Sequence, residues 1–152
     1  MDNTDYKILM LIQRKADAPL TEVANYAGVS KTACWNRIRR LEENGVIKGR
    51  HTKLCRFSLG LPVVVFLAIT VKQHTNEWVE QFKKLVDHYP QIIEAHRLTG
   101  ANADYQLKMV CKSIEDYDNL QQELIGKIEF NSMSSQVSLL EIKNSPMLPV
   151  IS

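Results

Sequence analysis

The chain has 152 residues, of which 45% are hydrophobic and 24% are charged, proportions typical of one globular domain or two small ones. The formal net charge is only +2, but residues 1–60 carry eleven basic and six acidic side chains, whereas the remainder carries eight and eleven. This asymmetry predicts a front part that binds a polyanion, joined to a part with a different task.

Simple patterns disfavour several protein classes. The first residues are charged and lack the apolar core of a secretory signal, and the longest apolar run, Leu61–Val71, is shorter than the roughly 20 residues that span a bilayer. Cys34, Cys55 and Cys111 form no CxxC pair, and the histidines show no metal-ligand spacing. The sequence has no glycine-rich phosphate loop, HExxH or nucleophile motif. We therefore expect a cytoplasmic protein with no membrane contact, metal, cofactor or enzymatic activity.

The first expected element is a helix that begins near two aspartates. Asp2 and Asp5 would lie at its positive N-terminus, where acidic side chains are favoured, and Pro19 interrupts the chain before the next helix. The residues expected to pack behind the following helices are Ile8, Leu9, Leu11 and Ile12.

Two further helices follow in close succession. A short helix is expected over Thr21–Ala27, and a tight turn at Gly28 leads into a longer helix within Ser30–Ile47. The small side chains of Ala24 and Ala27 would let the two helices cross closely. Two short helices joined by a tight, glycine-containing turn form a helix-turn-helix.

The longer helix combines an apolar stripe with a cationic face. Cys34, Ile38 and Leu41 recur at helical spacing, Ser30 is a candidate N-cap, and Gly45 is a candidate left-handed terminator. Arginine can bond guanine, asparagine can bond adenine, and a threonine methyl can touch thymine, so we expect this helix in a DNA major groove. The predicted contacts are Ser30, Lys31, Thr32, Trp35, Asn36, Arg37, Arg39 and Arg40. The alternative is an ordinary helical hairpin with a solvated basic face.

A basic stretch, residues 48–60, comes next. Val46–Lys48 and Leu54–Phe57 could pair as a two-stranded wing whose cations touch phosphate, which holds register without reading bases. These cations are Lys48, Arg50, Lys53 and Arg56. The alternative is a solvated basic linker. Gly60 and Pro62 predict a boundary between a winged helix-turn-helix domain (1–60) and a second domain (61–152).

The second half alternates strands and helices. Strands are expected at Leu61–Val71, Ile92–Thr99, Tyr105–Cys111 and Val137–Ile142. Asn76 is the expected cap of a first helix, and Ser113 with Asp116 forms a capping-box-like start of a second. Their expected buried stripes are Trp78, Phe82, Leu85 and Val86, then Ile114, Tyr117, Leu120 and Leu124. This β-α-β-β-α-β order is the ferredoxin-like unit, so the predicted fold class is α+β.

The first strand of this half is apolar on both faces. Val65, Leu67 and Ile69 would face the two helices, yet Val64 and Phe66 on the other face are apolar too. A split βαβ unit has helices on one side of its sheet only, so the other apolar face needs a different cover. Burying that face would contribute roughly 25 cal/mol per Å² of apolar surface. A second copy of the chain is the simplest cover, which predicts a two-fold dimer that can assemble further into a tetramer or octamer.

The stretch Ser30–Ile47 resembles the signature of the Lrp/AsnC regulators, the leucine-responsive and asparagine-responsive proteins of bacteria and archaea. The shared features are the opening Ser30, Arg37-Ile38, Leu41-Glu42 and Gly45-Val46-Ile47. The Asp2–Gln13 pattern resembles the first helix of the same regulators. In that family a ferredoxin-like, amino-acid-sensing domain follows the helix-turn-helix, so the resemblance covers both halves.

The resemblance also implies an effector site in the loop Thr99–Tyr105. In the family a glycine followed by an aspartate and often an aromatic residue lies at the edge of an amino-acid site between subunits. Gly100, Asp104 and Tyr105 match these roles. The backbone N–H groups of Gly100 and Ala101 and the hydroxyls of Ser134 and Ser135 could add hydrogen-bond donors. Here the aspartate comes four residues after the glycine instead of three. A plain β-turn that uses glycine and aspartate for turn geometry is the alternative.

These features predict a sequence-specific transcription regulator that binds double-stranded DNA and is tuned by a small amino acid or related metabolite. The alternative is an architectural DNA-binding protein of the same fold with no effector. The ratio of specific to nonspecific affinity at stated salt separates the two.

Overall fold

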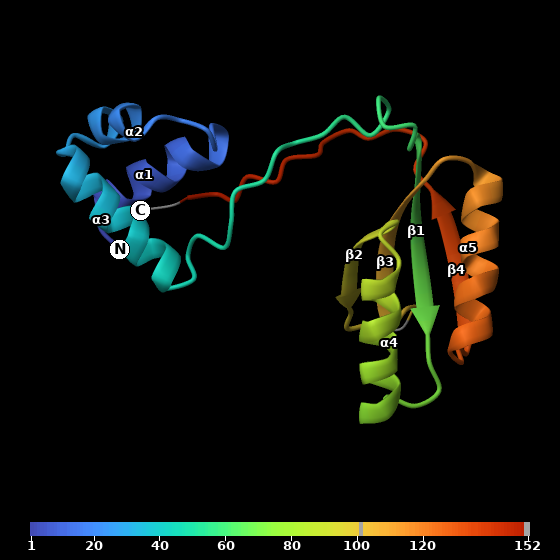
Figure 1. Ribbon diagram of the computed structural model, residues 1–152. Helices are drawn as coiled ribbons and strands as arrows, with labels where there is room; N and C mark the ends of the chain where they lie inside the picture. The colour runs from blue at the N-terminus through green and yellow to red at the C-terminus, as the bar shows by residue number, and fades with distance from the viewer. Residues whose placement is uncertain (101, 151–152) are drawn as a thin grey trace. The chain divides into compact units, whose positions relative to one another are not determined.

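The computed structural model describes residues 1–100 and 102–150. The chain forms two compact units, one built from Met1–Lys53 and the described residues from Lys143 onward, the other from Leu54–Ile142. Figure 1 follows the chain through both units. In the described part of the chain, none of the helices has the length and apolar character required to cross a membrane.

The first unit contains three helices, α1 (Asn3–Arg14), α2 (Leu20–Ala27) and α3 (Lys31–Glu43). Their core is a small cluster of Ile8, Val23, Ala24, Ala27, Cys34 and Ile38. Leu11 and Ile12 pack against this cluster. The expected helix-turn-helix and the apolar stripe of its second helix are therefore confirmed.

Local signals set the ends of α2 and α3. Gly28 adopts a left-handed conformation (φ 73°), and the Val29 N–H then donates to the Ala24 carbonyl over 3.0 Å. The Ser30 hydroxyl accepts from the Ala33 N–H at 3.2 Å and begins α3. Gly45, also left-handed (φ 69°), ends it, as glycine does where a Cβ would be strained.

The predicted wing strands are not formed: residues 44–62 contain no strand. The backbone N–H groups of Val46 and Ile47 both donate to the Leu41 carbonyl, at 2.9 and 3.1 Å, so they complete the end of α3. Further on, the Leu59 N–H donates to the Cys55 carbonyl in a helical turn. The amides of Val46 and Ile47 are therefore engaged locally and cannot join a strand ladder, and Arg56 and Phe57 lie within this turn.

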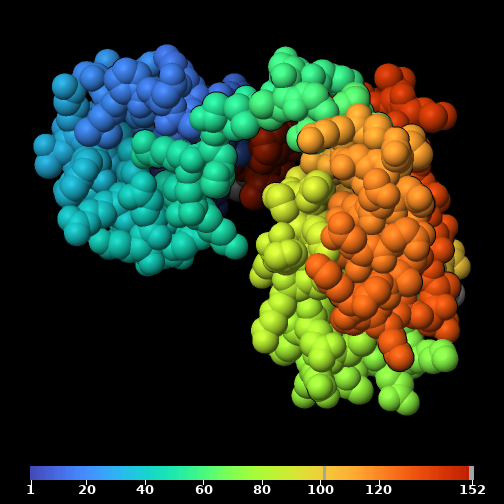
Figure 2. All heavy atoms as spheres, turned by 45° about the vertical axis from the view of Figure 1, so that its right-hand side comes forward, coloured from blue at the N-terminus to red at the C-terminus, as the bar shows by residue number. Residues whose placement is uncertain are grey.

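The second unit is a four-stranded antiparallel sheet in the order β2-β3-β1-β4. Its elements are β1 (Val63–Thr70), α4 (Asn76–His88), β2 (Ile92–Arg97), β3 (Tyr105–Cys111), α5 (Ile114–Lys127) and β4 (Ser132–Val137). Both helices lie on one face of the sheet (Figure 1), and Figure 2 shows the surface over α4 in yellow-green and α5 in orange. The ferredoxin-like topology and the α+β class are confirmed.

The core of this unit forms between the helices and β1. Val65, Leu67 and Ile69 are fully buried on the helix face. They pack with an aromatic group in which the Phe82 ring lies 4.9 Å from Trp78 and 4.8 Å from Tyr105. The prediction that β1 has apolar residues on both faces is confirmed, because the residues that alternate with this buried set point to the face without helices.

Three local predictions about the second unit were wrong. The last strand is Ser132–Val137, because its register on β1 runs from the Thr70–Ser132 pair to the Val65–Val137 pair. The Ser138 N–H still donates to the Val64 carbonyl, and β1 begins at Val63, so residues 140–142 extend beyond the end of β1. Helix α4 is capped by the Thr75 hydroxyl, which accepts from the Trp78 N–H, and Asn76 is its first residue. Ile114 is 53% exposed and does not join the stripe of α5.

Candidate DNA-binding surface and effector loop

The N-terminal half of α3 presents a free polar face. Lys31, Thr32 and Asn36 are exposed, and within the described residues their side chains make no hydrogen bond or ion pair. Ser30 precedes them as the N-cap. The buried stripe of Cys34, Ile38 and Leu41 lies on the opposite side of the helix, which fixes the orientation of the free face.

Trp35 and Arg39 form a second exposed group one turn apart. The Arg39 guanidinium carbon lies 5.3 Å from the centre of the Trp35 ring, and its Nε lies 3.1 Å from a Glu43 carboxylate oxygen. Stacking and the exposed (i, i+4) pair hold this cation loosely, because such pairs are worth about 0.3–0.5 kcal/mol. Arg39 is therefore available to a stronger anion.

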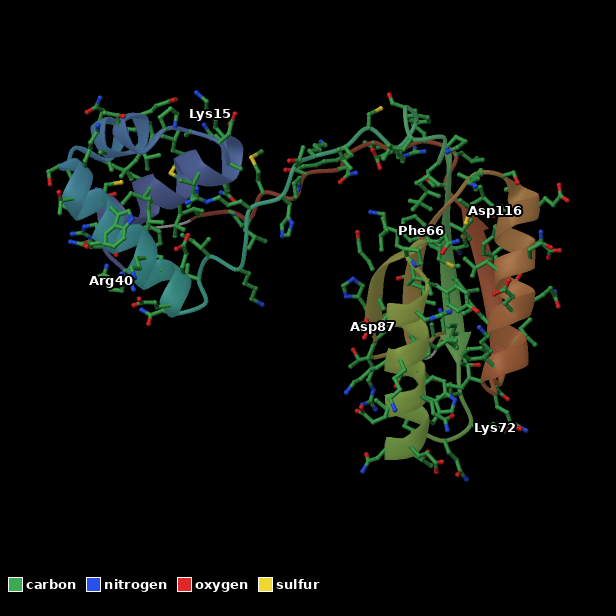
Figure 3. All side chains as sticks on the ribbon, in the orientation of Figure 1. Lys15, Arg40, Phe66, Lys72, Asp87 and Asp116 are labelled. Atoms are coloured by element: carbon green, nitrogen blue, oxygen red, sulfur yellow. The ribbon has the colours of Figure 1, made fainter. Side chains whose placement is uncertain are left out.

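Arg37 and Arg40 are already engaged within the first unit. Arg37 Nη1 lies 2.7 Å from Asp2 Oδ2 and 2.8 Å from Asp5 Oδ1, and Arg40 Nη2 lies 2.9 Å from Asp5 Oδ2. Arg40 is labelled on α3 in Figure 3. The prediction that Arg40 simply faces outward is incomplete, since α1 supplies its partner.

The pKa values of this cluster follow from its contacts. Burial raises the pKa of Asp5, but the Arg37 hydrogen bond and the Asp2 N–H together outweigh burial, so its pKa is lowered. The Asp5 N–H and then Arg37 lower the pKa of Asp2. Bonds to Asp5 and Asp2 raise the pKa of Arg37. The cluster therefore remains ionised at neutral pH.

The two remaining predicted DNA contacts follow α3 in irregular chain. Lys48 is exposed and has no side-chain partner among the described residues. Arg50 is exposed and lies 3.7 Å from Glu42, a weak pair. The two cations are near α3 in sequence, but they are not carried by a wing hairpin.

The predicted effector loop is organised around Asp104. Its Oδ2 accepts the Val71 N–H at 2.8 Å, its Oδ1 lies 3.4 Å from His74 Nε2, and its own N–H donates to the Ile69 carbonyl at 2.8 Å. Gly100 has a φ of 143°, a conformation that favours glycine. Ala101 lies outside the described residues.

The other predicted effector residues do not converge on one spot. Tyr105 is buried on the helix face of the sheet, where its hydroxyl lies 3.4 Å from His74 Nδ1. Ser135 is bonded to the Tyr117 hydroxyl on the same face. Ser134 is paired with Ala68 on the face without helices. The structure therefore brings Asp104, Tyr105 and His74 together, and His74 was missed because no spacing in the sequence links it to this loop.

Comparison with known proteins covers both units. Residues 1–48 match the family model for a winged helix-turn-helix DNA-binding domain, and residues 64–148 match the Lrp/AsnC ligand binding domain. The glutamate uptake regulatory protein of Zymomonas mobilis is 39% identical over 150 residues, covering 99% of this chain and 91% of that protein. The HTH-type transcriptional regulator Zrp of the same species is 40% identical over 149 residues, covering 98% and 97%.

Solved structures agree over the same length. An AsnC family transcriptional regulator from Agrobacterium tumefaciens matches with a TM-score of 0.93 and 35% identity, covering 99% of this chain and 97% of that chain. A transcriptional regulator from Neisseria meningitidis, solved in complex with L-Met, shares the fold with a TM-score of 0.92 and 24% identity over 99% and 97% of the two chains. The chain belongs to the Lrp/AsnC family of helix-turn-helix transcriptional regulators.

Proposed function

We propose that this regulator reads double-stranded DNA with the N-terminal half of α3 and does so as a two-fold dimer whose assembly responds to a small amino acid. One observation carries the DNA-binding part of the proposal. Lys31, Thr32 and Asn36 are exposed and without partners within the described residues, while the opposite face of the same helix is buried.

The free face of α3 has the chemistry of base readout. Asn36 can form a bidentate pair with adenine, Lys31 can donate to guanine, and the Thr32 methyl can contact thymine. In helix-turn-helix proteins the N-terminal residues of the second helix are the ones that reach base edges. Arg39, Lys48 and Arg50 are exposed cations suited to the phosphates, which add affinity and salt dependence.

The proposed dimer rests on the sheet face that has no helices. Phe66, labelled in Figure 3, and Ala68 are partly exposed there beside Val64 and Val110. Lys108 and Glu94 form a 2.8 Å ion pair on the same face. An apolar centre flanked by a satisfied ion pair is suited to a second copy of this sheet, and a two-fold dimer presents two recognition helices to an inverted repeat.

The proposed effector is a small amino acid bound at the loop that holds Asp104. The family model for this unit is a ligand binding domain, and the Neisseria meningitidis relative was solved with L-Met. The Asp104 carboxylate can accept an α-ammonium group in addition to its bonds to Val71 and His74. Ligand alters DNA binding only where it binds two assembly states unequally.

The test is a mobility shift with the purified protein, the DNA upstream of its own gene and a scrambled duplex, at one salt concentration. We expect tighter binding to the upstream DNA and a shift in that affinity with one of the common amino acids. Selective binding that no amino acid changes would contradict the effector role of Asp104. Equal binding to both duplexes would contradict sequence-specific readout and favour the architectural alternative.

A further inference from the structure

Asp5 occupies an unusual position for a carboxylate. It lies in the first turn of α1, yet only 1% of it is exposed, and among the described residues it is the one charged side chain in the buried class. Burying a charge is costly unless it is paired and hydrogen-bonded. The contacts of Asp5 therefore indicate what it does in the helix-turn-helix.

Both oxygens of Asp5 are directed at α3 and at the start of α1. Oδ1 accepts from Arg37 Nη1 at 2.8 Å, and Oδ2 accepts from Arg40 Nη2 at 2.9 Å and from the Asp2 N–H at 3.1 Å. Arg37 and Arg40 are three residues apart, so they lie on one face of α3 about one turn from each other. A single buried carboxylate thus holds α3 at two points along its axis.

These contacts also remove charge from the DNA-binding helix. Arg37 is further bonded to Asp2 Oδ2 at 2.7 Å, so two arginines face two aspartates and their charges cancel. A guanidinium paired with a carboxylate brings less net charge to the phosphate backbone, so we expect it to release less counterion from DNA. Among the described residues, by contrast, Arg39 is bonded only to an exposed glutamate and is stacked on Trp35.

We propose that Asp5 is a positioning residue for DNA recognition: it fixes the rotation of α3 and withholds Arg37 and Arg40 from the phosphate backbone. The consequence is selectivity. Base contacts from Lys31, Thr32 and Asn36 are kept in one orientation, while sequence-independent attraction is kept low. This inference rests on the proposed function, since it assigns a role to residues behind the same recognition helix.

The test is the salt dependence of DNA affinity, because log K falls with log[salt] by about 0.9 per phosphate contact. Asp5→Asn keeps the shape of the side chain and removes its charge. We expect a slope steeper by about 1–2 on scrambled duplex, tighter nonspecific binding and a smaller specific-to-nonspecific ratio. A second change, Arg40→Gln in the Asp5→Asn background, is expected to remove about half of the increase in slope that Asp5→Asn causes.

Single variants on the wild-type background provide a matched pair. Arg40→Gln is expected to leave the slope unchanged, whereas Arg39→Gln is expected to reduce it by about 0.9. Arg40 is half exposed, and Asp5 keeps its bonds to Arg37 and to the Asp2 N–H when Arg40 is replaced. We therefore expect Arg40→Gln to fold, which circular dichroism checks, and to keep the test valid even where Asp5→Asn unfolds the unit.

Two results would overturn the inference. One is a reduced slope for Arg40→Gln equal to that of Arg39→Gln, because Arg40 would then touch phosphate in the native complex. The other is a folded Asp5→Asn protein that loses specific and nonspecific affinity equally with an unchanged slope, as a purely structural role requires. Failure of the proposed function is separable: a wild type without sequence preference would contradict base readout, while the slopes on scrambled DNA would still decide the role of Arg40.

Discussion

The two units of this regulator are stabilised in different ways. The second unit has a continuous apolar core, in which β1 lies between β3 and β4 and its buried side chains pack against α4 and α5. The helix-turn-helix has a smaller apolar cluster, and polar contacts from α1 supplement it: Asp5 binds α3, and Gln13 binds the C-terminal segment of the chain. We infer that the DNA-binding surface depends on charge and hydrogen bonding, whereas the ligand-binding unit depends on packing.

A cavity in the core of the second unit should have the largest effect. Leu67 is fully buried at the centre of β1, so Leu67→Ala is expected to lower the free energy of unfolding by about 2–5 kcal/mol. Leu139→Ala is the matched control, because Leu139 is 96% exposed and surface changes remain within about 0.5 kcal/mol. Urea unfolding of both variants measures the difference. Equal midpoints would contradict the assignment of the core to β1.

Acid should destabilise the helix-turn-helix before the second unit. The pKa values of Asp2 and Asp5 are lowered in the folded protein. The stabilisation from these two carboxylates is therefore complete well above pH 3.9, about the pKa of an unfolded aspartate, and it is lost as the pH falls from there toward their pKa values in the folded protein. Glu94, whose pKa is lowered by Lys108, has the same sign in the second unit, but it is half exposed and its pair is screened.

Amide hydrogen exchange measures this difference, because it reports α3 and β1 separately. We expect α3 to lose protection at a higher pH than β1 does. Simultaneous loss in both units would show that the ion cluster does not set the acid stability of the first unit.

A smaller effect is expected where the C-terminal segment binds α1. The Gln13 side-chain amide donates to the Leu148 carbonyl at 3.0 Å and accepts the Leu148 N–H at 3.1 Å. Gln13→Leu removes both bonds and is expected to cost about 1–2 kcal/mol in the first unit. Gln122→Leu, at an exposed site without such bonds among the described residues, is the control. Faster proteolysis after Ile142 in Gln13→Leu, but not in Gln122→Leu, is the expected readout.

The reactivity of the three cysteines measures the difference in stability between the two units and requires no substitution. Hydrogen bonds from Ser58 and neighbouring N–H groups lower the pKa of exposed Cys55, whereas burial raises the pKa of Cys34 and, with Asp116 nearby, raises that of Cys111 to about 11. A disulfide reagent at neutral pH should therefore modify Cys55 first, then Cys34 in the smaller core, and Cys111 last. A faster reaction at Cys111 than at Cys34 would reverse the proposed order of stability.

Sequence reasoning was accurate where the determinant is local. Ser30 and Gly45 begin and end α3 through bonds within a few residues, and the alternation of Tyr105–Cys111 defines β3. It failed where a partner distant in sequence decides the outcome. The last strand is Ser132–Val137 because these residues pair with Val65–Thr70 of β1, a partner that its own composition does not reveal.

The binding sites show the same division. The exposed face of α3 follows from helical periodicity, but the occupation of Arg37 and Arg40 depends on Asp2 and Asp5, more than thirty residues away. The sequence did contain a signal for this cluster: Asp2 and Asp5 are three residues apart, and so are Arg37 and Arg40. Ser134 and Ser135 show a simpler limit, because adjacent residues in a strand point to opposite faces, so their two hydroxyls do not lie on the same face of the sheet.

The most direct test of the account is a selection of binding sites from random-sequence DNA by the wild type and by Asn36→Ala. We expect the wild type to recover an inverted repeat, and Asn36→Ala to lose its preference for adenine at one position in each half-site, with about 1–3 kcal/mol less discrimination there. Recovery of the same sequences with unchanged preference would show that the N-terminal half of α3 does not read the bases.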